Sequence, residues 1–252
     1  MTPRPGLGGV GSVAAGNSTG VSAPAPDRRA VVDALRRCYA AITEVTEHIE
    51  GAGGGLAGVG TGCAGWHAGD LLFHQLCDAR RALVALNTPG DRAPDRDAVT
   101  YWLGFPGRAD TTDTSDTTDD EHARFVRAVT AAYPPGALVA EWRATAAAAV
   151  VAAQRCPHPA VGTQGHVLTT TDFLDTLVVE ATVHHLDLTA EVPDAPAADP
   201  DGLRRVRRVL DGLLGHPAPF DWDDRTYALK GTGRLPLTGA ETALADRFPL
   251  FG

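Results

Sequence analysis

The chain has 252 residues, 44% of them hydrophobic and 21% charged, which suits one large globular domain, alone or with a small appended one. Its formal net charge of −9 argues against nucleic-acid binding, because phosphate recognition draws on clustered lysines and arginines. The four cysteines show no C-x-x-C spacing, and no apolar run approaches the ~18 residues of a membrane span, so we expect a reduced, cytoplasmic protein that does not bind membranes.

The first half of the chain alternates low-complexity segments with helical patterns. Residues 1–26 are dominated by Gly, Pro, Ser and Ala and predict a disordered leader. Over residues 27–50 apolar side chains recur every three or four positions, which indicates an amphipathic helix, and a Gly-rich loop follows over 51–65. A second helix is expected over 66–86. Farther along, a Thr/Asp tract predicts a solvated, mobile loop over 108–120.

Helical periodicity dominates the second half. Segments 121–132 and 136–155 predict a hairpin of two helices. A helix over 171–190 begins with Thr-Thr-Asp, which supplies good N-cap candidates. Another helix is expected over 200–214, and the tail 221–252 holds one or two short helices and turns.

Convincing strands are absent from these patterns, so the predicted fold class is mainly α. We expect a four-helix bundle over residues 27–192. Residues 193–252 would form a small C-terminal extension that packs near the candidate site around Glu180 and His184.

Glu180 and His184 form the sharpest candidate site. Residues four apart project from the same face of the predicted helix 171–190, so both can bind one ion, whereas His185 points away. At ~100° per residue the pair falls on the stripe that contains Phe173, which should face the bundle core. A buried carboxylate is costly unless it is paired or metal-bound. The pair is therefore either part of a metal site or a buried Glu-His hydrogen bond.

A third ligand has to come from another helix, and His74 is the remaining candidate among the nine histidines. It lies in the predicted helix 66–86 opposite the apolar face, on a polar stripe with Asp70, Asp78 and Arg81. That stripe is either exposed to solvent or lines an interior cavity, as metal ligands do in bundle enzymes. Periodicity alone leaves both interpretations open.

Three groups of residues carry a family resemblance. They are Trp66-x3-Asp70-Leu-x2-His74, then Thr169-x2-Asp172-Phe-Leu-x-Thr176-x3-Glu180-x3-His184-x2-Asp187-Leu188, then Trp222-x4-Tyr227-x-Leu-Lys-Gly-Thr-Gly-Arg234-x-Pro-Leu-Thr238. Together they resemble the mycothiol-dependent maleylpyruvate isomerase family, a branch of the DinB-like metalloenzymes. The Ala-, Gly-, Asp- and Arg-rich composition is similar to that of actinobacterial proteins. The resemblance implies a DinB-like four-helix bundle.

The resemblance also implies that His74, Glu180 and His184 bind zinc, although such ligand sets accept other divalent ions. Three protein ligands leave an open position, which the thiolate of the cosubstrate, mycothiol, would take to attack a small electrophile. The C-terminal part is shorter than the α/β domain expected of the isomerase itself. S-transfer is therefore favoured over isomerisation, in a monomer or a homodimer.

Four further residues are candidates for the surroundings of the metal site. Arg81 can bind a substrate carboxylate, or it can be an ordinary surface arginine. Arg234 lies where a loop could fold over the site and bind the substrate. Asp70 and Asp187 can orient the ligand imidazoles, or they can cap helices and be solvated.

Two other functions stay open on the sequence alone. One is a metal-dependent hydrolase of the same bundle type, because an open zinc site can also activate water. The other is a non-enzymatic protein that binds a small molecule and in which the Glu-His pair is structural.

Overall fold

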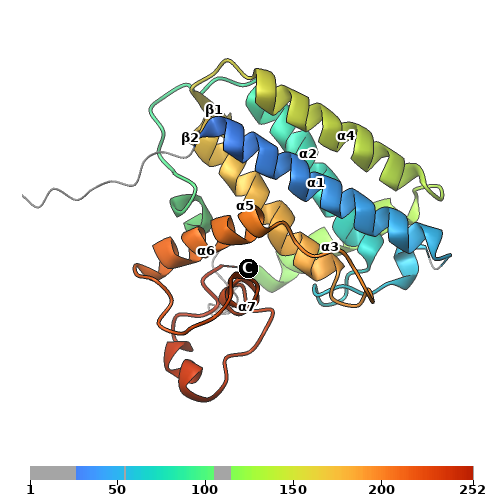
Figure 1. Cartoon of the computed structure of the whole chain (residues 1–252). Helices are drawn as coiled ribbons and strands as arrows, with labels where there is room; N and C mark the ends of the chain where they lie inside the picture. Colours follow the sequence, from blue (N-terminus) through green and yellow to red (C-terminus); the bar gives the residue numbers. More distant parts are fainter. Residues whose placement is uncertain (1–26, 54, 105–114, 252) are drawn as a thin grey trace, which may run out of the picture.

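Four long helices pack side by side and enclose most of the hydrophobic core (Figure 1). The computed structural model describes residues 27–53, 55–104 and 115–251, and the four helices are α1 (Arg28–Gly51), α2 (Ala68–Leu86), α4 (Ala137–Arg155) and α5 (Thr170–Leu188). Each contacts two others, in the order α1, α5, α2, α4 and back to α1, so they form a closed bundle. The predicted mainly α bundle is confirmed. The predicted leader and residues 108–114 of the predicted mobile loop lie outside the described residues.

Local sequence explains where these helices begin and which side of α1 is buried. The side chain of Asp27 accepts a hydrogen bond from the backbone N of Arg29, and that of Thr169 accepts one from Asp172, so each caps a first turn. Burial of one large aliphatic side chain contributes about 1.5–3 kcal/mol to the stability of the folded state. The apolar residues that predicted α1 are all buried, namely Val31, Leu35, Cys38, Ile42, Val45 and Ile49.

Helix α3 (Ser115–Ala131) lies against α2 outside the closed bundle. It begins six residues before the expected start at 121, so residues 115–120 of the tract expected to be a loop are helical. Val126 is buried in the core, and the side chain of Thr130 approaches Gly69 closely. These contacts place α3 beside the first turn of α2.

A β-hairpin between α4 and α5 was not expected from the sequence. Strands β1 (Ala160–Thr163) and β2 (His166–Thr169) pair antiparallel. Both residues of the connecting turn, Gln164 and Gly165, have positive φ angles of 46° and 78°, as a two-residue type I′ turn requires. Strands of four residues are too short for alternation to stand out, and Gly165 was the one usable signal.

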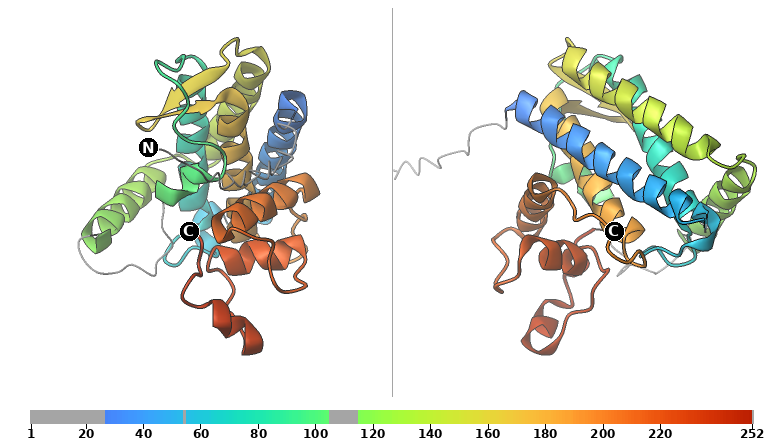
Figure 2. Two further views of the ribbon diagram at one scale, coloured as in Figure 1. Left: turned by 90° about the vertical axis from the view of Figure 1, so that its left-hand side faces the viewer. Right: turned by 45° about the vertical axis from the view of Figure 1, so that its right-hand side comes forward.

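The C-terminal extension packs on α5, on the side of the bundle away from α4 (Figure 2). It contains α6 (Pro200–Leu214) and α7 (Asp224–Gly231). Asp175 of α5, whose side chain is 1% exposed, pairs with Arg205 and Arg208 and so holds α6 in place. Short 3-10 helices occur at Leu56–Gly58, Thr100–Gly104 and Gly239–Leu244. Of the helices that the structure describes, none combines the length and the apolarity needed to cross a membrane.

Candidate metal centre

The structure brings His74, Glu180 and His184 together between α2 and α5. The Oε1 atom of Glu180 lies 3.2 Å from Nε2 of His74 and 3.3 Å from Nε2 of His184. One ligand atom from each residue lies within 4.8 Å of the other two. The side chains of His74, Glu180 and His184 are 28%, 21% and 14% exposed, so the cluster is partly buried and still reachable from outside.

The charges of the cluster are stabilised by its own hydrogen bonds. Burial disfavours ionisation of Glu180, but the hydrogen bonds with His184 and His74 outweigh it and hold the pKa of the carboxyl well below its ordinary value. Burial likewise disfavours protonation of His184, yet hydrogen bonds with Asp187, Cys63 and Glu180 raise its pKa well above the usual range. The cluster therefore keeps a carboxylate at its centre.

Asp187 orients the imidazole of His184. Its Oδ2 atom lies 2.9 Å from Nδ1 of His184, and with the Nδ1 proton held there, Nε2 is left to face Glu180. Arg234 from the C-terminal extension donates to both carboxylate oxygens of Asp187, at 2.6 and 2.8 Å. Burial opposes ionisation of Asp187, but its partners lower the pKa below the ordinary value. Arg234, expected to bind the substrate from a loop over the site, instead has its guanidinium paired with Asp187.

The other two residues singled out from the sequence do not touch the cluster through any hydrogen bond of the described residues. Asp70 accepts a hydrogen bond from the backbone N of His67 at 3.0 Å and caps α2, so the capping interpretation applies to it. Arg81 donates to Oδ1 of Asp78 at 2.7 Å and to Oγ1 of Thr163 at 3.2 Å. Its side chain is 19% exposed, so it is mostly buried rather than an ordinary surface arginine.

Cys63 is a neighbour of the site that the sequence did not single out. Its Sγ atom donates to Oδ2 of Asp187 at 3.3 Å, from the Gly-rich loop. Cys63, His184 and Asp187 form a second group with metal-ligating atoms. The guanidinium of Arg234 already neutralises Asp187, which disfavours a second cation there. No motif marks a cysteine in such a loop.

Two aromatic rings stand next to His74. The ring centroid of Trp66 lies 5.6 Å from that of His74, and the centroid of His122 on α3 lies 6.2 Å from it. His122 is exposed and stands at the rim of the cluster. His185 points elsewhere, as expected: it is 2% exposed, and burial lowers its pKa to about 4.

The donor set fits a divalent ion. Two imidazoles and one carboxylate suit zinc and several other transition metals, and they leave room for a further ligand. Nitrogen and oxygen ligands about 2.0–2.1 Å from a tetrahedral zinc are about 3.3 Å apart. The separations of 3.2 and 3.3 Å between Glu180 and the two imidazole nitrogens fit that spacing, and they are also the lengths of Glu-His hydrogen bonds.

Comparison with known proteins gives one match. The model of a family described as the mycothiol maleylpyruvate isomerase N-terminal domain matches residues 38–189, which is more than half of the chain. The matched segment contains His74, Glu180, His184 and Asp187 but not Arg234. No curated protein and no solved structure was found to match.

Proposed function

The chain belongs to the mycothiol maleylpyruvate isomerase N-terminal domain family, and on that premise we propose that it is a metal-dependent enzyme that activates mycothiol for attack on a small electrophile. The observation that supports this proposal most is the convergence of His74 and His184 on the carboxylate of Glu180. Three protein ligands from two helices are typical of a catalytic rather than a structural zinc site.

A divalent ion bound there would supply a Lewis acid that lowers the pKa of a thiol from about 8.5 toward neutrality. The protein's own residues set the charge around it. Glu180 contributes one negative charge, and Arg234 offsets that of Asp187. A site with a divalent ion therefore stays net positive, which favours an incoming anion such as a thiolate.

In the proposed reaction the thiol sulfur forms a bond to an electrophilic carbon, and the thiol proton goes to the neighbouring atom of the substrate. If the C–S bond persists, the product is an S-conjugate. If it breaks again after rotation within the adduct, the thiol is released and the substrate is isomerised.

Two arginines have different roles in this proposal. Arg234 is a positioning residue, because it reaches the site through Asp187. Arg81 is mostly buried beside Asp78, and its remaining N–H groups can donate to a polar substrate. Because Asp78 already neutralises Arg81, these N–H groups favour a hydrogen-bond acceptor over a second full negative charge.

Metal analysis of the purified protein tests the first half of the proposal. We expect about one divalent ion per chain in the wild type and large losses in His74→Ala and Glu180→Gln, because each removes one of three ligands. His216→Ala is the matched control, since His216 is exposed and its one hydrogen bond among the described residues is with the adjacent Pro217. A wild-type protein that binds no divalent metal would overturn the proposal.

Incubation of the metal-loaded protein with candidate electrophiles, and with mycothiol, glutathione or no thiol, tests the second half. Mass spectrometry should show a conjugate or an isomer only when a thiol is present, with mycothiol preferred. Turnover that is unchanged without thiol would show instead that the site activates water. Absence of turnover with all thiols, in a protein that binds the electrophile, would favour a binding protein.

A further inference from the structure

The polar stripe of α2 continues beyond His74 with Asp78 and Arg81. These residues follow His74 by four and seven positions, so all three lie on one side of the helix. At about 1.5 Å per residue they lie about 6 and 10 Å farther along the helix axis. The Cζ atom of Arg81 is 5.6 Å from the ring centroid of Phe173, which precedes Glu180 on α5. Asp78 and Arg81 thus extend the contact between α2 and α5 that holds the metal cluster.

The pair of Asp78 and Arg81 keeps hydrogen-bonding capacity that no described residue uses. Both hydrogen bonds from Arg81 to Asp78 end on Oδ1, so Oδ2 accepts none from the described residues. Oδ2 is not one of the fully buried atoms that lack a partner there, so it stays in contact with solvent. Arg81 gives one more hydrogen bond, to Thr163, which leaves two of the five N–H groups of its guanidinium. The pair can therefore both accept from a ligand and donate to it.

Gln75 is a third polar side chain with unused hydrogen-bonding capacity. It precedes Asp78 by three residues, so the two side chains are neighbours on the surface of α2. Gln75 is 2% exposed, and its Nε2 atom has no hydrogen-bond partner among the described residues. Buried polar groups are nearly always hydrogen-bonded, so an unpaired amide next to a functional site points to a ligand atom. Rotation of the amide can bring this donor to a group held at Asp78.

The three side chains together carry no net charge. Asp78 and Arg81 neutralise each other, and Gln75 is uncharged. Burial disfavours the charge of Arg81, yet Asp78 and, more weakly, Glu180 raise its pKa above the ordinary value. A ligand carboxylate would meet an arginine that is already paired, and a ligand ammonium would meet a paired aspartate. Neutral hydroxyl groups, which both donate and accept, match the open acceptor and the open donors.

We propose that Asp78, Arg81 and Gln75 bind a neutral, hydroxyl-bearing part of the thiol and so determine which thiol the enzyme uses. The inference rests on the proposed function, because it takes the metal cluster as the place of the thiol sulfur. The rest of the thiol extends from that place, and the three side chains lie within about 10 Å of His74 along α2. Asp78 accepts the proton of a hydroxyl group, and Arg81 and Gln75 donate to hydroxyl oxygens. A thiol without hydroxyl groups leaves these atoms unpaired and binds more weakly.

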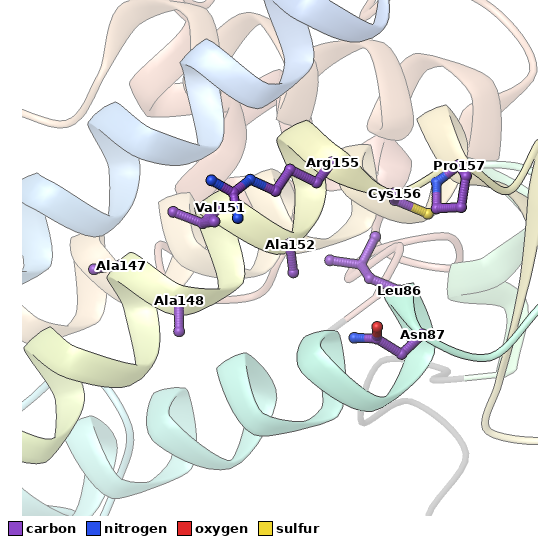
Figure 3. A pocket seen from close by; sticks show the side chains of 9 residues that line it. All are labelled: Leu86, Asn87, Ala147, Ala148, Val151, Ala152, Arg155, Cys156 and Pro157. Atoms are coloured by element: carbon purple, nitrogen blue, oxygen red, sulfur yellow. The ribbon is translucent and has the colours of Figure 1, made fainter.

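A groove on the outside of the bundle, between α4 and the end of α2, is another place where a hydroxyl-bearing ligand could bind (Figure 3). Its volume is about 480 Å³, and its lining is mostly apolar, with Arg155 as the charged side chain in it. No described carboxylate lines this groove, so the pairing of donor and acceptor found at Asp78 and Arg81 is missing there. Arg155→Gln is therefore the control for binding in this groove.

Isothermal titration calorimetry of the metal-loaded protein, without an electrophile, tests the inference. The probes are mycothiol, which carries a neutral sugar part, and N-acetylcysteine amide, a neutral thiol without hydroxyl groups. We expect the wild type to bind mycothiol about tenfold more tightly or better. Gln75→Met and Asp78→Asn should each weaken mycothiol binding about tenfold and leave the binding of N-acetylcysteine amide unchanged, because each removes or weakens a hydrogen bond to a hydroxyl group. Arg155→Gln and Gln154→Met change exposed side chains of α4 and should bind both probes as the wild type does.

The melting temperature of the thiol-free protein is a second readout for Gln75. Gln75→Met replaces an unpaired buried amide with an apolar side chain of similar size, so the variant should melt at or above the wild-type temperature. Replacement of a merely structural glutamine, hydrogen-bonded within the protein, would instead lower the melting temperature. That result would overturn the assignment of Gln75.

Equal binding of the two probes by the wild type, or mycothiol binding that both Gln75→Met and Asp78→Asn leave unchanged, would overturn the inference. A wild type that prefers mycothiol, and two variants that lose this preference, would support it. Failure of the proposed function is a different result, because it shows as a protein without bound metal or without thiol-dependent turnover.

Discussion

Replacement of Asp187 by asparagine separates the orientation of His184 from its role as a ligand. Asp187→Asn keeps the shape of the side chain but replaces a charged acceptor with a neutral one 2.9 Å from Nδ1 of His184. The asparagine also carries an N–H₂ group, a donor, which would face either Arg234 or the imidazole of His184. Both of these groups donate to Asp187 and need an acceptor there. We therefore expect weaker metal binding, although none of the three ligands has changed.

The size of the effect follows from the lost hydrogen bond. A hydrogen bond to a charged group contributes about 1.5–3 kcal/mol and one between neutral groups about 0.5–1.5 kcal/mol. The difference of about 1–1.5 kcal/mol corresponds to roughly tenfold in the dissociation constant. Loss of the charge of Asp187 also leaves Arg234 unpaired, which lowers the free energy of unfolding by about 3–5 kcal/mol.

Competition between the metal-free protein and a chromophoric chelator measures the affinity, at a temperature where all variants are folded. Asp175→Asn is the matched control: it removes a carboxylate of the same helix, equally buried and also paired with arginines, but on the side that faces α6. Both variants should lose stability, and only Asp187→Asn should lose affinity. Equal metal affinity of Asp187→Asn and the wild type would refute the orienting role.

Two more predictions concern the surroundings of the site. A Cβ atom on Gly62 would lie 2.7 Å from Oδ1 of Asp187, so Gly62→Ala should weaken metal binding several-fold in the same titration. Gly58 has open space around it, so Gly58→Ala is the control and should leave the metal affinity unchanged. Equal metal affinities of the two variants would contradict this steric argument. The hydrogen bond from Lys230 lowers the pKa of Glu241 to about 2. The charged carboxylate of Glu241 therefore stabilises the folded state fully above the ordinary glutamate pKa of about 4.3, and this stabilisation is lost as the pH falls toward 2. The difference in melting temperature between the wild type and Glu241→Gln should therefore shrink between pH 5 and pH 2, and a constant difference would show that Glu241 acts without its charge.

The sequence predicted the helices well because each bundle helix carries its own signals. The bounds of α5 differ from the expected 171–190 by two residues at most, because a capping threonine begins the helix. The β-hairpin was missed because its strands are stabilised by contacts with distant residues, such as the bridge between Pro89 and Val161. Propensity within a window of four residues cannot report such contacts.

The position of His74 shows what periodicity cannot decide. A helix with neighbours on several sides buries its polar stripe when that stripe faces another polar surface, and α2 contacts α3, α4 and α5. Asp70 is 5% exposed, and the side chains of Asp78 and Arg81 are 15% and 19% exposed. The stripe is therefore largely buried rather than exposed to solvent. The sequence of one helix does not contain this information, because it depends on which helices surround it.

The pairing of Arg234 with Asp187 links the C-terminal extension to the candidate metal site. The family match ends at residue 189, so it includes the aspartate that orients His184 and excludes the arginine that neutralises it. Without Arg234, the buried charge of Asp187 would be balanced only by a protonated His184, and a protonated imidazole cannot bind a metal. The arginine thus allows Asp187 to stay charged when His184 gives up its proton to bind a metal. The extension is in this sense part of the site, and its local unfolding should weaken metal binding even though it contributes no ligand.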